Sequence, residues 1–290
     1  MSFDLYLFPP DQAAFDEKAF AALFAGRPHY VMAPGEALYR DNDSGVYFSF
    51  EHIVPGAEIG EDEMDEDGEP DPRFDAPSIF FAVNLLRSHV FALEAAVELA
   101  ALCGARGLTL YDPQSGLDSG TFDAEAFMAG WQHANEGAKL AMAGRPETLH
   151  SLPAAANAEI WRWNLGREAL RRGIGPGVSV PLLQYIAGPN GAVRRVFVWP
   201  MSQPVIVPDG AEWALLIDDL ASPGLFARLR GKAKGPQVRG IVPFAAFALL
   251  IRKEGSHRRL DPPTPAQAAN LQRQAEPPGE RLAADVVLDA

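Results

Sequence analysis

The chain opens with the stretch Ser2-Phe3-Asp4-Leu5-Tyr6-Leu7-Phe8, which Pro9-Pro10 follows directly. Phe3, Leu5 and Leu7 recur with a period of two, which places them on one face of a β-strand. The two prolines cannot continue a strand ladder, so the strand is expected to end there. The chain therefore begins with a strand that buries one face.

Apolar patterns continue an alternation of strands and helices up to residue 115. The expected elements after the first strand are a helix capped by Asp11, a hairpin around residues 41–45, a strand over 78–86, an apolar helix closed by Gly104 and a strand over 108–111. This order is that of a ferredoxin-like βαββαβ unit, in which two helices cover one face of an antiparallel sheet. We therefore predict an α+β fold, with a ferredoxin-like unit over residues 1–115.

Three further segments are expected: a helical connection (116–172), a second β-rich unit (173–260) and a Pro-rich tail (261–290). Apolar residues recur at helical spacing through the connection. In the β-rich unit, Gly188-Pro189-Asn190-Gly191 is a typical hairpin turn. In the tail, Thr264-Pro265 can start a short helix, and the last residues are expected to be loosely held.

The composition is that of a globular protein. Of the 290 residues, 48% are hydrophobic and 22% are charged, so a sizeable core is expected. The N-terminus lacks the basic region of a signal peptide, and no apolar run is long enough to cross a bilayer. The predicted location is therefore the cytoplasm, with no membrane partner. The single cysteine, Cys103, cannot form an internal disulfide and is expected to be a buried thiol.

The chain has a net charge of −13, and its charged residues are distributed unevenly along the sequence. Residues 1–161 contain 27 acidic and 8 basic residues, whereas residues 162–290 contain 11 acidic and 17 basic residues. An acidic surface repels phosphate, which argues against nucleic acid as a partner. It attracts a protein with a basic surface. Solubility alone is the simpler explanation of the same charge.

The segment 58–75 is the most distinctive local feature. Its density of like charges and its lack of apolar residues predict an exposed acidic loop. The loop could be a solvated linker, could contact a cationic partner, or could bind a divalent cation. Its glycine is misplaced for an EF-hand, and we predict no metal site. The candidate partner-binding residues are Glu61, Asp62, Glu63, Asp65, Glu66 and Asp67.

The helix expected near residues 155–172 carries the remaining candidates. Trp161 and Trp163 diverge by about 200° around a helix, so one is expected in the core. Trp163 is the candidate surface anchor for a partner, because tryptophan often anchors interfaces. Three arginines crowd the end of the helix, where positive charge suits the helix dipole. These candidate anion-binding residues are Arg167, Arg171 and Arg172.

No local catalytic motif is present. The six histidines show no metal-ligand spacing, and neither a nucleophile elbow nor a P-loop occurs. The glycines Gly173, Gly175 and Gly177 lie after a helix and before a strand, the reverse of a phosphate-binding loop. No cofactor is predicted, and a non-enzymatic binding protein is the favoured reading. The alternative is an enzyme or small-anion-binding protein with a site at the junction of the two halves, because catalytic groups can assemble from distant positions.

The opening Met1-Ser2-Phe3-Asp4-Leu5-Tyr6-Leu7-Phe8 resembles the first strand of bacterial immunity proteins from polymorphic-toxin and type VI secretion systems. Those proteins are cytoplasmic, often acidic and poor in motifs, and each binds and neutralises a toxin. The resemblance implies an immunity-like or antitoxin-like inhibitor. No functional residue is carried over from it.

Overall fold

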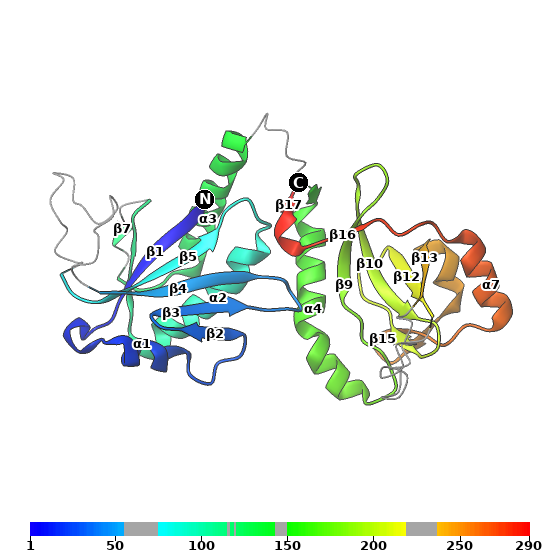
Figure 1. Cartoon of the computed structure of the whole chain (residues 1–290), viewed down its shortest axis with the longest axis horizontal. Helices are drawn as coiled ribbons and strands as arrows, with labels where there is room; N and C mark the ends of the chain where they lie inside the picture. The colour runs from blue at the N-terminus through cyan, green and yellow to red at the C-terminus, as the bar shows by residue number, and fades with distance from the viewer. Residues whose placement is uncertain (55–74, 115–116, 119, 143–149, 219–236) are drawn as a thin grey trace, which may run out of the picture. The chain divides into compact units, whose positions relative to one another are not determined.

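The computed structural model describes residues 1–54, 75–114, 117–118, 120–142, 150–218 and 237–290 (Figure 1). The chain divides into two compact units, Met1–Thr148 (unit 1) and Leu149–Ala290 (unit 2). Both units contain helices and strands, which confirms the predicted α+β class.

Unit 1 is built on a seven-stranded sheet in which every neighbouring pair is antiparallel. The strand order is β2-β3-β4-β5-β1-β6-β7 (Figure 1). As the alternation predicts, β1 buries Phe3, Leu5 and Leu7 on one face. The bounds are β1 (Ser2–Phe8), β2 (Tyr30–Ala33), β3 (Glu36–Arg40), β4 (Tyr47–Ile53), β5 (Ser78–Asn84), β6 (Thr109–Asp112) and β7 (Leu117–Asp118).

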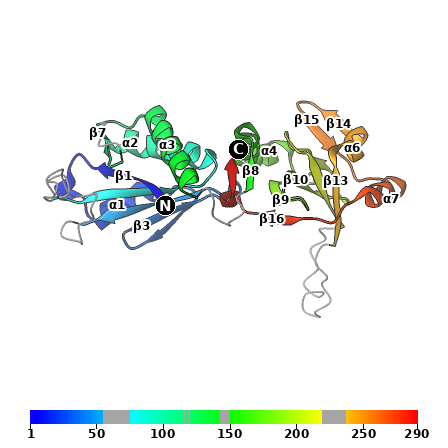
Figure 2. The same ribbon diagram turned by 90° about the horizontal axis from the view of Figure 1, so that it is seen from above.

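Three helices cover one face of this sheet, which we call the inner face. They are α1 (Glu17–Phe24), α2 (Val90–Arg106) and α3 (Ala124–Met142). Phe24 of α1 packs on Phe50 with 5.1 Å between ring centroids, and Phe127 of α3 packs on Phe81 at 6.2 Å. Phe50 and Phe81 lie directly opposite each other on β4 and β5, so both helices meet the same face. Figure 2 shows α2 and α3 on one side of the strands.

Two helix ends in unit 1 differ from the predictions. The cap of α1 is Asp16, whose Oδ1 accepts the N–H of Ala19 at 2.8 Å, because a short 3-10 turn (Gln12–Ala14) follows Asp11. Helix α2 continues past Gly104 and ends at Arg106, and the C-cap residue Gly107 has a φ of 65°. A left-handed residue ends a helix at little cost when it is glycine.

Unit 2 contains a five-stranded sheet of order β13-β12-β10-β9-β16, a three-stranded sheet of order β11-β15-β14 and the pair β17-β8. Phe197, Trp199 and Phe247 lie at the centre of its core. The strands are β8 (His150–Leu152), β9 (Leu183–Ala187), β10 (Val193–Pro200), β11 (Val205–Ile206), β12 (Trp213–Ile217), β13 (Val238–Pro243), β14 (Ile251–Glu254), β15 (His257–Leu260), β16 (Glu280–Leu282) and β17 (Val287–Asp289). The helices are α4 (Ala154–Ile174), α6 (Phe244–Phe247) and α7 (Pro265–Gln274), with short 3-10 turns at Ala248–Leu250 and Ala284–Val286.

The expected helical connection over residues 116–172 is divided between the two units. Helix α3 packs against α2 within unit 1, whereas α4 packs against β9 and β17 within unit 2. Each helix buries one face inside its own unit, so the pair does not form a separate segment.

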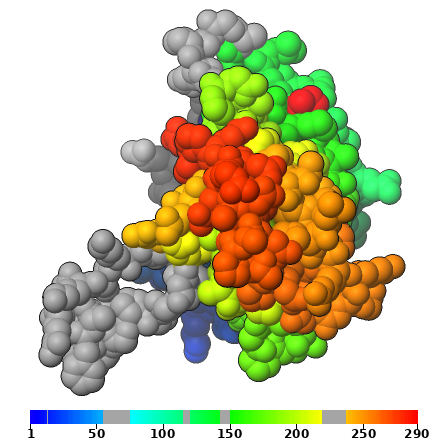
Figure 3. All heavy atoms as spheres, turned by 90° about the vertical axis from the view of Figure 1, so that its right-hand side faces the viewer, coloured from blue at the N-terminus to red at the C-terminus, as the bar shows by residue number. Residues whose placement is uncertain are grey.

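The residues expected to form a loose tail, 261–290, are also integrated into unit 2. Strand β16 pairs with β9, and β17 pairs with β8. Leu271 of α7 is buried, and the predicted cap is present, because the Thr264 hydroxyl and the Gln267 side chain form a reciprocal capping box. Figure 3 shows this part of the chain, coloured from orange to red, across one face of the molecule.

Candidate functional site

The face of the unit 1 sheet opposite the helices carries a continuous row of side chains. Glu36 lies directly opposite Glu51, Glu51 opposite Phe80, Phe80 opposite Tyr6, and Tyr6 opposite Tyr111. Directly opposed residues on neighbouring strands point to the same side of a sheet. We call these five residues the outer row.

The two carboxylates of the outer row are exposed at one end of it. Among the described residues, no base forms an ion pair with Glu36 or Glu51. Like charges directly opposite each other in a sheet are destabilising, by roughly 0.2–1 kcal/mol. The pair therefore presents an uncompensated negative charge on the sheet surface.

Aromatic rings continue the outer row beyond the carboxylates. The ring centroids of Tyr6 and Phe80 are 5.4 Å apart, and those of Tyr6 and Tyr111 are 6.4 Å apart. Tyr6 is buried, whereas Phe80 and Tyr111 are half-buried. Carboxylates beside aromatic faces form a surface that favours cationic side chains.

The inner face carries a buried polar cluster centred on Glu94 of α2. Its Oε1 accepts hydrogen bonds from the hydroxyl of Tyr39 at 2.7 Å and from the hydroxyl of Ser44 at 3.1 Å. Burial, followed by the Glu94 carboxylate, raises the pKa of Tyr39 well above its ordinary value. Tyr39 is therefore a hydrogen-bond donor and not a base, and the cluster fastens the β3–β4 hairpin to α2.

A second glutamate on α2 extends this polar cluster. The Glu98 carboxylate accepts from the hydroxyl of Tyr30 at 2.9 Å and pairs with the Arg27 guanidinium at 3.0 Å. Burial, followed by Glu98, raises the pKa of Tyr30 as well. These contacts hold the start of β2 against α2, so they serve as structural supports of the sheet edge.

The six acidic residues Glu61, Asp62, Glu63, Asp65, Glu66 and Asp67 lie outside the described residues. Trp163 is half-buried against the core of unit 2, and its Nε1 donates to the carbonyl oxygen of Pro181 at 2.8 Å. Leu165, the next apolar residue along this helix, is 39% exposed. The buried face of α4 passes through Asn157, Ile160 and Asn164.

The three candidate arginines lie along the second half of α4 and all have partners. Arg167 donates to the carbonyl oxygen of Val180 at 3.3 Å, which links it to the segment before β9. Arg171 pairs with the Glu168 carboxylate at 2.9 Å, and Arg172 donates to the Glu168 carbonyl oxygen at 3.4 Å. These contacts occupy the arginines within unit 2, and none of the three lines the pocket described below.

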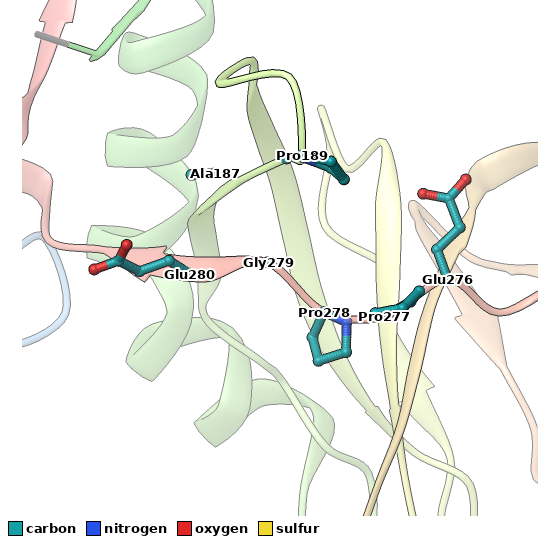
Figure 4. A pocket seen from close by; sticks show the side chains of 8 residues that line it. Ala187, Pro189, Glu276, Pro277, Pro278, Gly279 and Glu280 are labelled. Atoms are coloured by element: carbon teal, nitrogen blue, oxygen red, sulfur yellow. The ribbon is translucent and has the colours of Figure 1, made fainter. Parts of the chain in front are cut away.

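A pocket of about 530 Å³ in unit 2 lies between the Gly188-Pro189 turn and the segment 276–280 (Figure 4). The carboxylate of Glu276 on its rim is held by Arg194 at 2.9 Å, and Arg194 lies 4.1 Å over the ring of Trp213. The residues that line the pocket include no serine, cysteine or histidine. The pocket therefore offers no nucleophile of those kinds.

Two kinds of feature are absent from the residues that the structure describes. No group of three or more His, Cys, Asp or Glu side chains there is arranged to hold a metal ion. Within those ranges, no helix combines the length and the apolar character that a membrane span requires.

Comparison with known proteins finds no matching family model, no matching curated protein and no matching solved structure.

The outer row is a feature that the sequence alone did not predict. Its members come from five strands between residues 6 and 111, and only the strand register places them side by side. The sequence did contain one signal, the alternation of Glu36 with Ala37 and of Phe80 with Phe81. This alternation indicates which residues of a strand share a face, but it does not indicate which strands lie side by side.

Proposed function

We propose that this chain is a non-enzymatic protein that binds a partner protein with a basic surface through the outer row of unit 1. The observation that carries the proposal is the pair Glu36 and Glu51, directly opposed, exposed and without a described counter-ion. A pair of like charges that weakens the sheet is compensated when a lysine or arginine of a partner lies between them.

The rest of unit 1 supports the same choice of partner. Residues 1–148 contain 26 acidic and 8 basic residues, so a basic protein is attracted at long range. Phe80, next to Glu51, offers an aromatic face to the same cation. The segment with Glu61 to Asp67 adds acidic charge to this unit, and we propose that it contributes to the attraction.

We further infer an immunity-like or antitoxin-like inhibitory role in the cytoplasm, based on the resemblance of the first strand. We also propose that β4, β5, β1 and β6, with α1 and α2, form a ferredoxin-like unit. The antiparallel order β4-β5-β1-β6 supports this assignment. On this reading, β2–β3, β7 and α3 are additions to the unit.

The test is capture of partners from native lysate by the tagged full chain, at low and at moderate salt, with identification by mass spectrometry. The variant carries Glu36→Gln and Glu51→Gln, which remove charge but keep side-chain size. The matched control carries Glu125→Gln and Glu136→Gln, two exposed positions on α3. Both double variants change the net charge by the same amount.

We expect one stoichiometric basic protein that binds the wild type and the α3 control, and that is lost as salt rises. The outer-row variant should bind it at least tenfold more weakly, which corresponds to the loss of about 1.4 kcal/mol. Equal weakening in both double variants would show that only net charge matters. A wild-type chain that retains no basic protein would contradict the proposed function.

A further inference from the structure

Strand β2 forms a free edge of the unit 1 sheet. It is the terminal strand in the sheet order, and among the described residues it pairs with β3 alone. Its side chains are unusually apolar for an exposed edge, because Val31 is 63% exposed and Met32 is 41% exposed. Exposed apolar edges are templates for pairing with another strand, and natural proteins usually protect them.

The register shows which backbone groups of β2 are free. The N–H of Arg40 donates to the carbonyl oxygen of His29 at 2.8 Å, so residue 29 bonds to the β3 side. In an antiparallel ladder this direction alternates, and the backbone groups of Val31 therefore also point to β3. The backbone N–H and C=O groups of Tyr30 and Met32 point away from the sheet. These two residues are two positions apart, which is the spacing at which an added strand forms hydrogen bonds.

We propose that β2 accepts a β-strand of the basic partner, which extends the sheet of unit 1 to eight strands. This inference rests on the proposed function and specifies how the partner is held. Main-chain hydrogen bonds to Tyr30 and Met32 supply the attachment, and side chains on alternate positions supply the selectivity.

The side-chain pattern of the added strand follows from the register. Ala33 lies directly opposite Glu36, so it is in line with the outer row, and Val31 lies on the same face. A residue of the added strand beside Val31 meets an apolar side chain. A residue beside Ala33 meets a small one and lies two strand spacings, about 10 Å, from the backbone of Glu36. A long lysine or arginine side chain can pass over Ala33 and approach the Glu36 carboxylate.

The same charges select the occupant. A second copy of this chain paired through β2 would bring two strongly acidic units together, with Glu36 close to the junction of each. Repulsion between like charges opposes that pairing. The fitting occupant is a strand with an apolar residue beside Val31 and a basic residue two positions along, beside Ala33. The apolar residue matches the exposed apolar edge, and the basic residue matches the carboxylates.

The test uses the full chain and a soluble eight-residue peptide. Threonine occupies every second position of this peptide, and valine and lysine take turns in the positions between. A control peptide carries glutamate in place of lysine. Residue-resolved hydrogen exchange is measured with each peptide at millimolar concentration. With the lysine peptide, we expect the amides of Tyr30 and Met32 to exchange at least about tenfold more slowly, whereas the amide of Val31, already bonded to β3, changes little. The glutamate peptide should have no effect.

Two variants separate backbone pairing from side-chain contact. Met32→Pro removes an outward N–H without removing a bond to β3, and should abolish protection of Tyr30. Met32→Ala keeps the N–H and should retain that protection. Lysine-peptide binding that protects neither amide, equal effects of the two peptides, or protection of both amides in a peptide-free dimer would each overturn the inference.

The outcome is distinguishable from failure of the proposed function. If Met32→Pro still captures the basic partner that the Glu36→Gln, Glu51→Gln variant loses, the binding role stands and strand addition is wrong. If the wild-type chain captures no basic protein, the proposed function itself fails.

Discussion

Asn164 of α4 exchanges two hydrogen bonds with the main chain of Leu183 on β9. Its Nδ2 donates to the Leu183 carbonyl oxygen at 3.0 Å, and its Oδ1 accepts the Leu183 N–H at 2.9 Å. The side-chain amide thus satisfies both backbone groups of a buried residue, as a neighbouring strand would. Together with Trp163 and Arg167, it holds the segment before β9 against the helix.

We expect Asn164→Leu to reduce the free energy of unfolding of unit 2 by about 2–4 kcal/mol, because it leaves a buried N–H and a buried C=O without partners. Urea denaturation followed by tryptophan fluorescence measures the change. Leu165→Ala, at the exposed neighbouring position, is the control and should shift stability by less than about 0.5 kcal/mol. Equal effects of the two substitutions would contradict the role of the amide.

Gly279 lies directly against the main chain of Ala187. A Cβ atom at this position would clash with the carbonyl oxygen of Ala187. Gly279→Ala should therefore displace β16 from β9 and lower the midpoint of thermal unfolding by several degrees, for a cost of at least about 2 kcal/mol. Gly166→Ala, on α4 with open space around it, should be neutral or stabilising by up to about 1 kcal/mol. A Gly279→Ala protein as stable as the wild type would refute the contact.

The raised pKa of Tyr39 makes the stability of unit 1 depend on pH. The unfolded chain releases the phenol proton above about pH 10, whereas the folded chain retains it. This contribution is fully present below pH 10 and is lost as pH rises further, by up to about 1.4 kcal/mol per pH unit for one proton. Denaturation curves between pH 8 and pH 11 should show a shallower decline for Tyr39→Phe than for the wild type. An unchanged slope would contradict the assignment.

The opposed carboxylates of the outer row are expected to lower the free energy of unfolding of unit 1. Glu36→Gln removes one of two directly opposed like charges, and we expect it to raise the free energy of unfolding by about 0.2–1 kcal/mol at low salt. The gain should shrink as salt rises, because exposed charges are screened. Glu125→Gln on α3 is the control without a cross-strand acidic neighbour. Destabilisation by Glu36→Gln would show that Glu36 has a stabilising contact within the chain.

Several elements could be predicted because they depend on neighbours in sequence. The alternation in residues 2–8 defines β1, the turn at 41–45 joins β3 to β4, and Thr264-Pro265 starts α7. Each follows from a local rule of strand period, turn chemistry or helix capping. The identity of the strands on either side of β1, by contrast, could be learned only from the folded structure.

The buried face of α4 shows why hydrophobic periodicity was insufficient. It contains Asn157 and Asn164, polar residues that an apolar pattern assigns to the surface. Asn157 is fully buried because its Nδ2 donates to the carbonyl oxygen of Leu288 at 3.0 Å, 131 residues away. The same contact explains why residues 261–290 are not a loose tail. Buried polar side chains in proteins are usually hydrogen-bonded, and here the partner lies far away in the chain.

The primary structure alone accounts for the α+β class, the acidic first half and the approximate places of most helices and strands, since these depend on composition and on short-range periodicity. Tertiary structure decided the two-unit division, the burial of Asn157 and Asn164, and the juxtaposition of Glu36 with Glu51 and the aromatic rings. Strand order and register bring together residues that are far apart in the chain, and no local propensity encodes those neighbours.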